Sequence, residues 1–143
     1  MRNLILTVVT ILSIGATSVA SAHRQETVKS EAVKRETFTL RAGKQKRVAR
    51  GELTIKFVNV IEDSRCPVGV NCIQAGNAKI QVKVTDRRGQ TKTMELNTNK
   101  EPKRDQLGPY AINLVNLEPQ PMKEGKPARS RYTTRFSIQR LRS

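Results

Sequence analysis

The stretch AKIQVKVTDRRGQTKTMELN, residues 78–97, carries the pattern of an antiparallel β-hairpin. Every second side chain of its first half is apolar, and these positions are Ala78, Ile80, Val82 and Val84. The residues between them are polar, so the segment predicts a strand with one buried face and one wet face. Residues 86–89, DRRG, supply an aspartate that opens a turn and a glycine that tolerates unusual backbone angles. Residues 91–97 then return as the second strand.

The same alternation recurs on both sides of this hairpin. It marks four further segments, which are residues 37–40, 52–61, 110–117 and 131–139. Turn-forming Gly, Pro and Asn separate the segments, and none of them has a helical period. Aromatic residues make up only 3% of the chain, so the core must be built from Val, Ile and Leu, which favour strands. We therefore predict an all-β fold, an antiparallel β-sandwich of Ig-like or Greek-key type with about six to eight short strands.

The N-terminal residues indicate export. Arg2 precedes an apolar run that ends in the small residues A-S-A, as in a secretory signal peptide, and we assign residues 1–22 to it. The run is shorter than the roughly 20 residues that a membrane-spanning helix needs, so we expect no membrane span after cleavage. The expected location is periplasmic or extracellular. Polar residues 23–36 are expected to form a flexible N-terminal extension, and residues 37–143 a single β-sandwich domain.

Cys66 and Cys72 are the two cysteines of the chain. In an oxidising compartment a close pair of this kind predicts a disulfide. Five residues separate them, which differs from the C-x-x-C spacing of redox centres. A zinc site would need three or four ligands, which the two cysteines alone do not provide. Closing so short a loop stabilises the fold by roughly 2 kcal/mol on the chain-entropy model, so we expect the disulfide to shape a local loop.

The residues around the cysteines form a recognisable motif. It runs D-S-R-C-P from Asp63 to Pro67, continues with Cys72, and ends in A-G-N-A at residues 75–78. The motif resembles a family of small exported bacterial proteins with D-S-R-C-P, a second cysteine and A-G-x-A before a strand. The resemblance spans residues 53–120 and implies a β-sandwich and export, without implying a particular activity. Members often carry an aromatic residue before the A-G, where this chain has Gln74.

The motif also has a structural interpretation. Its candidate scaffold or recognition residues are Asp63, Ser64, Arg65, Pro67 and Gly76. Asp63 is expected to cap the turn after the long strand, and Arg65 to pin the loop by pairing with Asp63, with Glu62 or with backbone carbonyls. Pro67 stiffens the loop, and Gly76 allows backbone angles that other residues avoid. The alternative is a recognition loop carried on a rigid sandwich.

The sequence argues against catalysis. Ser64 is adjacent to Asp63, but the one histidine, His23, lies at the start of the expected mature chain, and no free cysteine is expected. A mechanism with paired carboxylates needs two acids that face each other across a cleft. Glu62 and Asp63 are neighbours, so in an extended chain their side chains point to opposite faces. We therefore expect no enzyme.

No metal and no cofactor are expected either. A copper site at His23 would require a second histidine, which the chain lacks. Four loop and strand-end residues carry oxygen atoms that a calcium ion could use, namely Glu62, Asp63, Asn71 and Asn77. Such residues more often serve turns.

The chain has a formal net charge of +15. A protein surface with this excess of positive charge either attracts anions over a distance or serves only to keep the protein in solution. The arginines expected to contact an anion are Arg47, Arg50, Arg87, Arg88, Arg129 and Arg131. Nucleic acid is not the expected partner, because export separates the chain from it and few aromatic residues are left for base stacking. Anionic envelope components fit better, such as lipopolysaccharide, anionic lipid or an acidic polymer.

The sequence thus predicts an exported, non-catalytic binding or structural module that engages an anionic envelope component through a basic surface. The alternative is a protein-directed inhibitor or immunity-type module, in which loop 63–77 inserts into a partner and the disulfide limits the entropy lost on binding. An enzyme is the least favoured reading.

Overall fold

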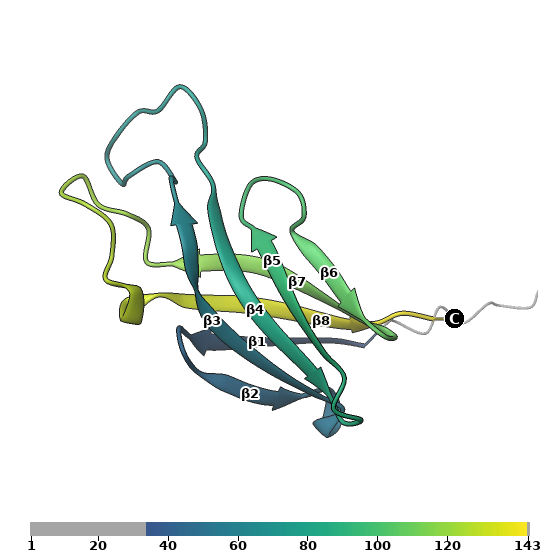
Figure 1. Cartoon of the computed structure of the whole chain (residues 1–143). Coiled ribbons are helices and arrows are strands. Elements are labelled where there is room, and N and C mark those ends of the chain that lie inside the picture. The colour runs from purple at the N-terminus through teal and green to yellow at the C-terminus, as the bar shows by residue number, and fades with distance from the viewer. Residues whose placement is uncertain (1–33, 143) are drawn as a thin grey trace, which may run out of the picture. The chain divides into compact units, whose positions relative to one another are not determined.

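The computed structural model describes residues 34–142, which form two antiparallel four-stranded sheets (Figure 1). Sheet A contains, in spatial order, β1 (Arg35–Arg41), β8 (Thr133–Arg140), β7 (Tyr110–Glu118) and β6 (Arg104–Leu107). Sheet B contains β2 (Gln45–Val48), β3 (Leu53–Asp63), β4 (Ala78–Asp86) and β5 (Thr91–Asn97). Two short 3₁₀ turns, η1 (Ala49–Gly51) and η2 (Arg129–Arg131), complete the elements. The predicted all-β antiparallel fold is confirmed.

The central strands are buried as their alternation predicts. Four apolar residues of β4 have no exposed surface, namely Ala78, Ile80, Val82 and Val84. The hairpin of residues 78–97 is also present, with β4 paired to β5. The carboxylate of Asp86 accepts the backbone N–H groups of Arg88 and Gln90, both at 2.8 Å, and Gly89 has a φ of +85°. The turn is therefore fixed by the two residues that mark it in the sequence.

Three phenylalanines join the two sheets in the core. Phe136 of β8 is fully buried, and its ring lies 5.6 Å from that of Phe38 in β1 and 6.5 Å from that of Phe57 in β3. The second pair crosses from sheet A to sheet B in an edge-to-face arrangement, which aromatic rings favour. Truncating Phe136 to Ala would remove both contacts and leave a cavity, at a cost of about 3–5 kcal/mol.

Two strands, β2 and β6, are absent from the sequence prediction. Each is an edge strand of four residues with a single buried residue, Val48 in β2 and Leu107 in β6. Short polar edges protect a sheet against pairing with other chains, and their polar side chains erase the alternation by which strands are recognised. The ammonium group of Lys46 in β2 lies 5.7 Å from the centroid of the Phe38 ring in β1.

The boundaries of two other strands differ from expectation. Strand β1 begins at Arg35, so Arg35 and Glu36 of the expected extension belong to sheet A. Arg35 pairs with Gln139, and the carboxylate of Glu36 accepts the backbone N–H of Ala49 at 2.8 Å. Strand β8 begins at Thr133, because Arg131 lies in η2. The expected signal peptide, residues 1–22, and residues 23–33 lie outside the described residues.

Candidate functional site

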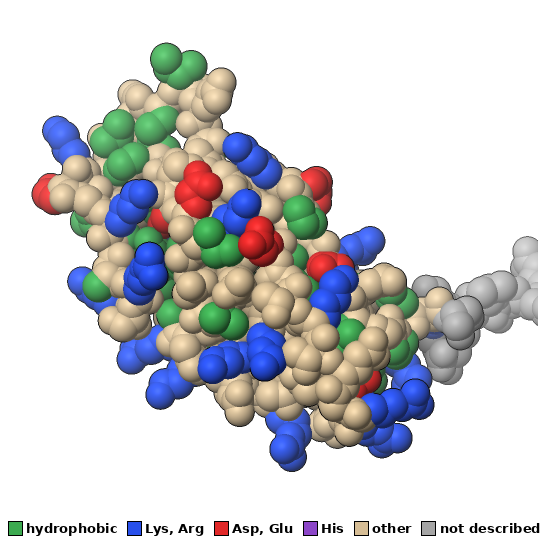
Figure 2. Space-filling model, viewed as in Figure 1, with side chains coloured by type: hydrophobic (Ala, Val, Ile, Leu, Met, Phe, Trp, Pro, Cys, Tyr) green, Lys and Arg blue, Asp and Glu red, His purple; other side chains and the backbone are tan. Residues whose placement is uncertain are grey.

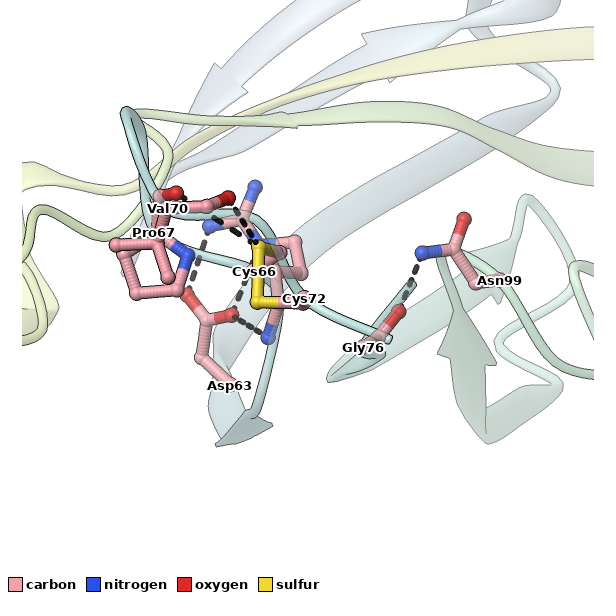
Figure 3. Close-up of a disulfide and its surroundings, with 8 residues drawn as sticks. Asp63, Cys66, Pro67, Val70, Cys72, Gly76 and Asn99 are labelled. Atoms are coloured by element: carbon pink, nitrogen blue, oxygen red, sulfur yellow. Dashed lines mark hydrogen bonds and ion pairs between the residues drawn. A yellow bond between two sulfur atoms is a disulfide. The ribbon is translucent and has the colours of Figure 1, made fainter. Parts of the chain in front are cut away.

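The loop between β3 and β4, residues 64–77, extends beyond the end of sheet B (Figure 1). Within it Cys66 and Cys72 form a disulfide, with their Cα atoms 6.0 Å apart, as the sequence predicted. Figure 3 shows the disulfide beside Asp63, at the point where the loop leaves β3. We call residues 64–77 the stapled loop.

A buried ion pair holds the second residue of this loop, Arg65. The guanidinium of Arg65 donates to both carboxylate oxygens of Asp63, at 2.8 and 2.7 Å, and its backbone N–H donates to the same carboxylate at 3.2 Å. The side chains are almost fully covered, with 9% of Arg65 and 2% of Asp63 exposed. The expected pairing of these two residues is therefore present. Asp63 caps the turn and Arg65 pins it.

The same two side chains reach across to sheet A. Arg65 donates to the backbone carbonyls of Leu117 and Pro119, the latter at 2.8 Å, and Tyr132 donates its hydroxyl proton to Asp63 at 2.8 Å. Burial raises the pKa of Tyr132 to about 12, and the neighbouring Asp63 carboxylate adds to the effect. Burial alone would raise the pKa of Asp63 too, but hydrogen bonds from Arg65 and Tyr132 outweigh it and lower that pKa. We call Asp63, Arg65 and Tyr132 the root cluster.

A second set of contacts closes the other end of the loop. Ser64 donates both its backbone N–H and its hydroxyl to the carbonyl of Asn77, at 2.7 and 2.9 Å. The Asn99 side chain donates to the carbonyl of Gly76, as Figure 3 shows. The reason expected for Gly76 is wrong, because Gly76 does not have a positive φ. A Cβ there would lie 1.6 Å from the carbonyl oxygen of Ser64, so close backbone approach requires the glycine.

The outer part of the stapled loop exposes aliphatic side chains. They are those of Val68, Val70 and Ile73, and Met122 of the loop between β7 and β8 is exposed as well. Hydrophobic side chains project at the top of Figure 2, where Figure 1 places the stapled loop. We call these four residues the apolar tip. The apolar tip is absent from the sequence prediction, although the run V-G-V-N-C-I places three aliphatic residues among turn formers.

Four of the six predicted anion-contacting arginines gather at the opposite end of sheet B. Arg47 lies in β2, Arg50 in η1, and Arg87 and Arg88 in the β4–β5 turn. The turn is tied to η1 and β3 through Glu52, whose carbonyl accepts the Arg87 N–H at 3.0 Å and whose carboxylate pairs with the Arg87 guanidinium. Blue side chains crowd this lower right end in Figure 2.

Two lysines extend this cationic group onto the outer face of sheet B. Lys56 of β3 and Lys83 of β4 stand directly opposite each other in the strand register. The residues that flank them in the same row are Gln45 and Thr93, so this row contains no carboxylate to offset the two charges. Like charges in directly opposed positions repel and destabilise a sheet.

We define the basic face as Arg47, Arg50, Lys56, Lys83, Arg87 and Arg88. Between residues 34 and 142, Arg87 is its one member with an ion pair. None of the other five cations of the face forms an ion pair with a described residue.

Arg129 and Arg131 do not join this face. Both lie in η2, near the stapled-loop end of the sandwich. Arg131 instead lines an open hollow together with Arg41, Lys44, Ser130 and Thr133. The predicted set of six arginines is thus divided between two ends of the molecule.

No family model matches the chain, and no curated protein or solved structure matches it significantly. The resemblance drawn from the D-S-R-C-P motif therefore stays a prediction. In the described part of the chain, no three His, Cys, Asp or Glu side chains gather as a metal site would require. Over the same residues, no helix is long and apolar enough to cross a membrane.

Proposed function

We propose that this protein is an exported, non-catalytic binding module that engages an anionic component of the cell envelope through the basic face. The observation that carries the proposal is the opposition of Lys56 and Lys83 in the β3–β4 register. Their Cβ atoms stand about 5 Å apart at such positions, and folding alone gains nothing from the repulsion. A bound anion would turn it into attraction.

The distribution of charge on sheet B supports a local binding surface over a general solubilising coat. Near the stapled loop the outer face of the sheet is mixed in charge, with Lys79 lying 3.6 Å from Glu95 and opposite Glu62. Toward the β4–β5 turn the same face carries Lys56 and Lys83 without acids in their row. A coat for solubility does not by itself account for two directly opposed lysines in a row without an acid.

The backbone of η1 adds a second argument. Ala49 and Arg50 have φ values of +52° and +56°, in the left-handed region that favours glycine. A side chain there costs roughly 1 kcal/mol or more, and such strain persists where the surroundings or the function require it. The Glu36 carboxylate fixes Ala49 through its N–H at 2.8 Å, and Arg50 is presented to solvent beside Arg47 and the β4–β5 turn.

The stapled-loop end supports the non-catalytic part of the proposal. The carboxylate of Asp63 is occupied by Arg65 and Tyr132, and Ser64 donates its hydroxyl to a backbone carbonyl. No base accepts that hydroxyl proton, as activation of a serine nucleophile would need. The disulfide supports export, since such bonds persist mainly in oxidising compartments.

The ligand would carry repeated phosphate or carboxylate groups, because the six cations are spread over β2, β3, β4 and two turns. Attraction of this kind acts beyond contact distance and weakens as salt shortens the screening length. Lipopolysaccharide, anionic lipid and acidic polymers share this chemistry.

The test is binding of the exported chain to purified lipopolysaccharide and to an acidic polymer across a salt series. We compare the charge-reversal pair Arg87→Glu/Arg88→Glu with Arg129→Glu/Arg131→Glu, which changes net charge equally at the other end. The first pair is expected to lower affinity for the acidic polymer roughly tenfold or more, about 1.4 kcal/mol, and the second much less. Equal losses on the polymer would show that net charge alone determines binding. Binding that does not depend on salt would favour the protein-directed alternative on loop 63–77.

A further inference from the structure

The apolar tip is the most exposed hydrophobic region in the described part of the chain. Ile73 is 104% exposed, Met122 56%, Val68 52% and Val70 37%. These residues come from two loops that contact each other, since the backbone N–H of Val68 donates to the carbonyl of Pro121 at 3.0 Å. Grouped exposed aliphatic side chains on a small protein mark a surface that meets another apolar phase.

The exposure of the tip is built into the fold. The disulfide closes residues 66–72, and the root cluster fastens the loop to both sheets. Asn77 is fixed through its amide group, which donates to Asn97 at 2.8 Å. A loop held in this way cannot fold its aliphatic residues back onto the core. It also loses little entropy when it meets a ligand.

The charges around the tip indicate what it meets. Arg65 is the one charged residue of the stapled loop, and it is turned into the root cluster. The tip itself therefore presents no charge. The neighbouring segment, residues 119–131, carries four cations and one acid, which are Lys123, Lys126, Arg129, Arg131 and Glu124. The apolar tip, which is uncharged and flanked by cations, is therefore complementary to a layer with an anionic surface and an apolar interior.

The tip residues are aliphatic, and neither the stapled loop nor residues 119–131 contain an aromatic side chain. Protein-binding hot spots are enriched in Trp, Tyr and Arg, whereas insertion into hydrocarbon requires only apolar area. We propose that the apolar tip inserts into the headgroup–acyl boundary of an anionic lipid membrane, with the cations of residues 119–131 on the phosphates. This goes beyond the proposed function, because the basic face begins in the middle of β4 and its arginines at the β4–β5 turn lie beyond the far end of that strand, about 30 Å away along nine residues.

The absence of tryptophan from the chain gives a direct reporter of insertion. The Ile73→Trp variant carries the sole tryptophan at the tip. The matched control is Val115→Trp, because Val115 is 53% exposed but lies in β7, away from the tip. Vesicles of phosphatidylglycerol and phosphatidylethanolamine should shift the emission of Ile73→Trp to the blue, and brominated acyl chains should quench it. The Val115→Trp emission should not change.

The energetic test uses Ile73→Ser and Val115→Ser, since both change one exposed aliphatic residue without touching the core. Sedimentation with the same vesicles should show roughly tenfold weaker binding for Ile73→Ser, as expected for loss of one buried aliphatic side chain. Val115→Ser should bind as the unaltered chain does. Equal binding by all three overturns the proposal.

The two proposals fail separately. Arg87→Glu/Arg88→Glu should leave the blue shift of Ile73→Trp intact, and Ile73→Ser should leave binding to an acidic polymer intact. If vesicles bind the chain, Ile73→Trp is silent and the arginine pair abolishes binding, tip insertion is refuted while the basic face stands. If Ile73→Trp is silent and no vesicle binds, tip insertion is refuted and a protein cleft becomes the candidate occupant.

Discussion

The hydroxyl of Tyr132 donates a 2.8 Å hydrogen bond to the carboxylate of Asp63, across 69 positions of sequence. Tyr132 directly precedes β8 in sheet A, and Asp63 ends β3 in sheet B. This bond therefore locks the two sheets together at the point where the stapled loop begins. The start of the loop is therefore held in a fixed position relative to both sheets.

Removing that hydroxyl should weaken the fold without changing its shape. Tyr132→Phe leaves Asp63 buried with one donor fewer, and we expect a loss of about 1–2 kcal/mol in unfolding free energy, measured by urea denaturation. Tyr110→Phe is the control, since between residues 34 and 142 nothing hydrogen-bonds to the Tyr110 hydroxyl. Equal losses in the two variants would mean that the bond contributes nothing specific.

Removing the Arg65 guanidinium should cost more. Arg65→Ala leaves the Asp63 carboxylate buried without its cation, and the carbonyls of Leu117 and Pro119 without their donor. We expect about 3–5 kcal/mol of lost stability. A loss below about 1 kcal/mol, the range of exposed pairs, would show that solvent reaches the root cluster freely.

The root cluster should also make the stability of the fold depend on pH in the acid range. The pKa of Asp63 lies below its ordinary value of 3.8 in the folded chain, so the unfolded chain takes up a proton first as the pH falls. The stabilisation is complete above pH 3.8 and is lost as the pH falls through the lower folded pKa. Urea midpoints measured from pH 7 to pH 2 should therefore fall more steeply for the unaltered chain than for Asp63→Asn. If the urea midpoints of the two chains fell equally with pH, Asp63 would not be a source of the loss of stability in acid.

Gly76 should be less replaceable than a glycine in an open turn. Gly76→Ala forces a Cβ into the Ser64 carbonyl, so the root of the loop must shift, and we expect a loss of about 1–3 kcal/mol or more. Gly43→Ala is the comparison, because Gly43 has a φ of +81° and nothing within 4 Å of an added Cβ. Thermal unfolding of the two variants should rank Gly76→Ala as the less stable, and the reverse order would contradict the close approach.

The basic face predicts opposite effects on stability and binding. Lys83→Glu replaces the repulsion with Lys56 by an attraction across β3 and β4, and should raise stability by about 0.2–1 kcal/mol. The same change should weaken binding to an anionic polymer. Lys79→Glu is the control, since it breaks the contact with Glu95 and faces Glu62, and should lower stability. A Lys83→Glu chain that is less stable, or that binds as before, would argue against the proposed surface.

The sequence predicts the central strands well because burial on one face leaves a period of two. It does not reveal β2 and β6, since an edge strand with exposed polar side chains has no such period. The pairing of Arg65 with Asp63 could be predicted because the two residues are only two positions apart. The bond from Tyr132 could not, since it depends on how β8 packs against β3. The division of the six arginines likewise follows from strand order, which local patterns do not encode.

The pairing of β1 with β8 also governs when this chain can fold. The seven residues of β1, from Arg35 to Arg41, find their partners only in residues 133–139. A chain that emerges from its N-terminus therefore keeps β1 unpaired until residues 133–139 have appeared, and Phe38 is without Phe136 for equally long. Sheet A cannot be completed before β8 has appeared, and a chain truncated before Thr133 would leave that sheet without its second strand and β1 without its hydrogen-bonded partner.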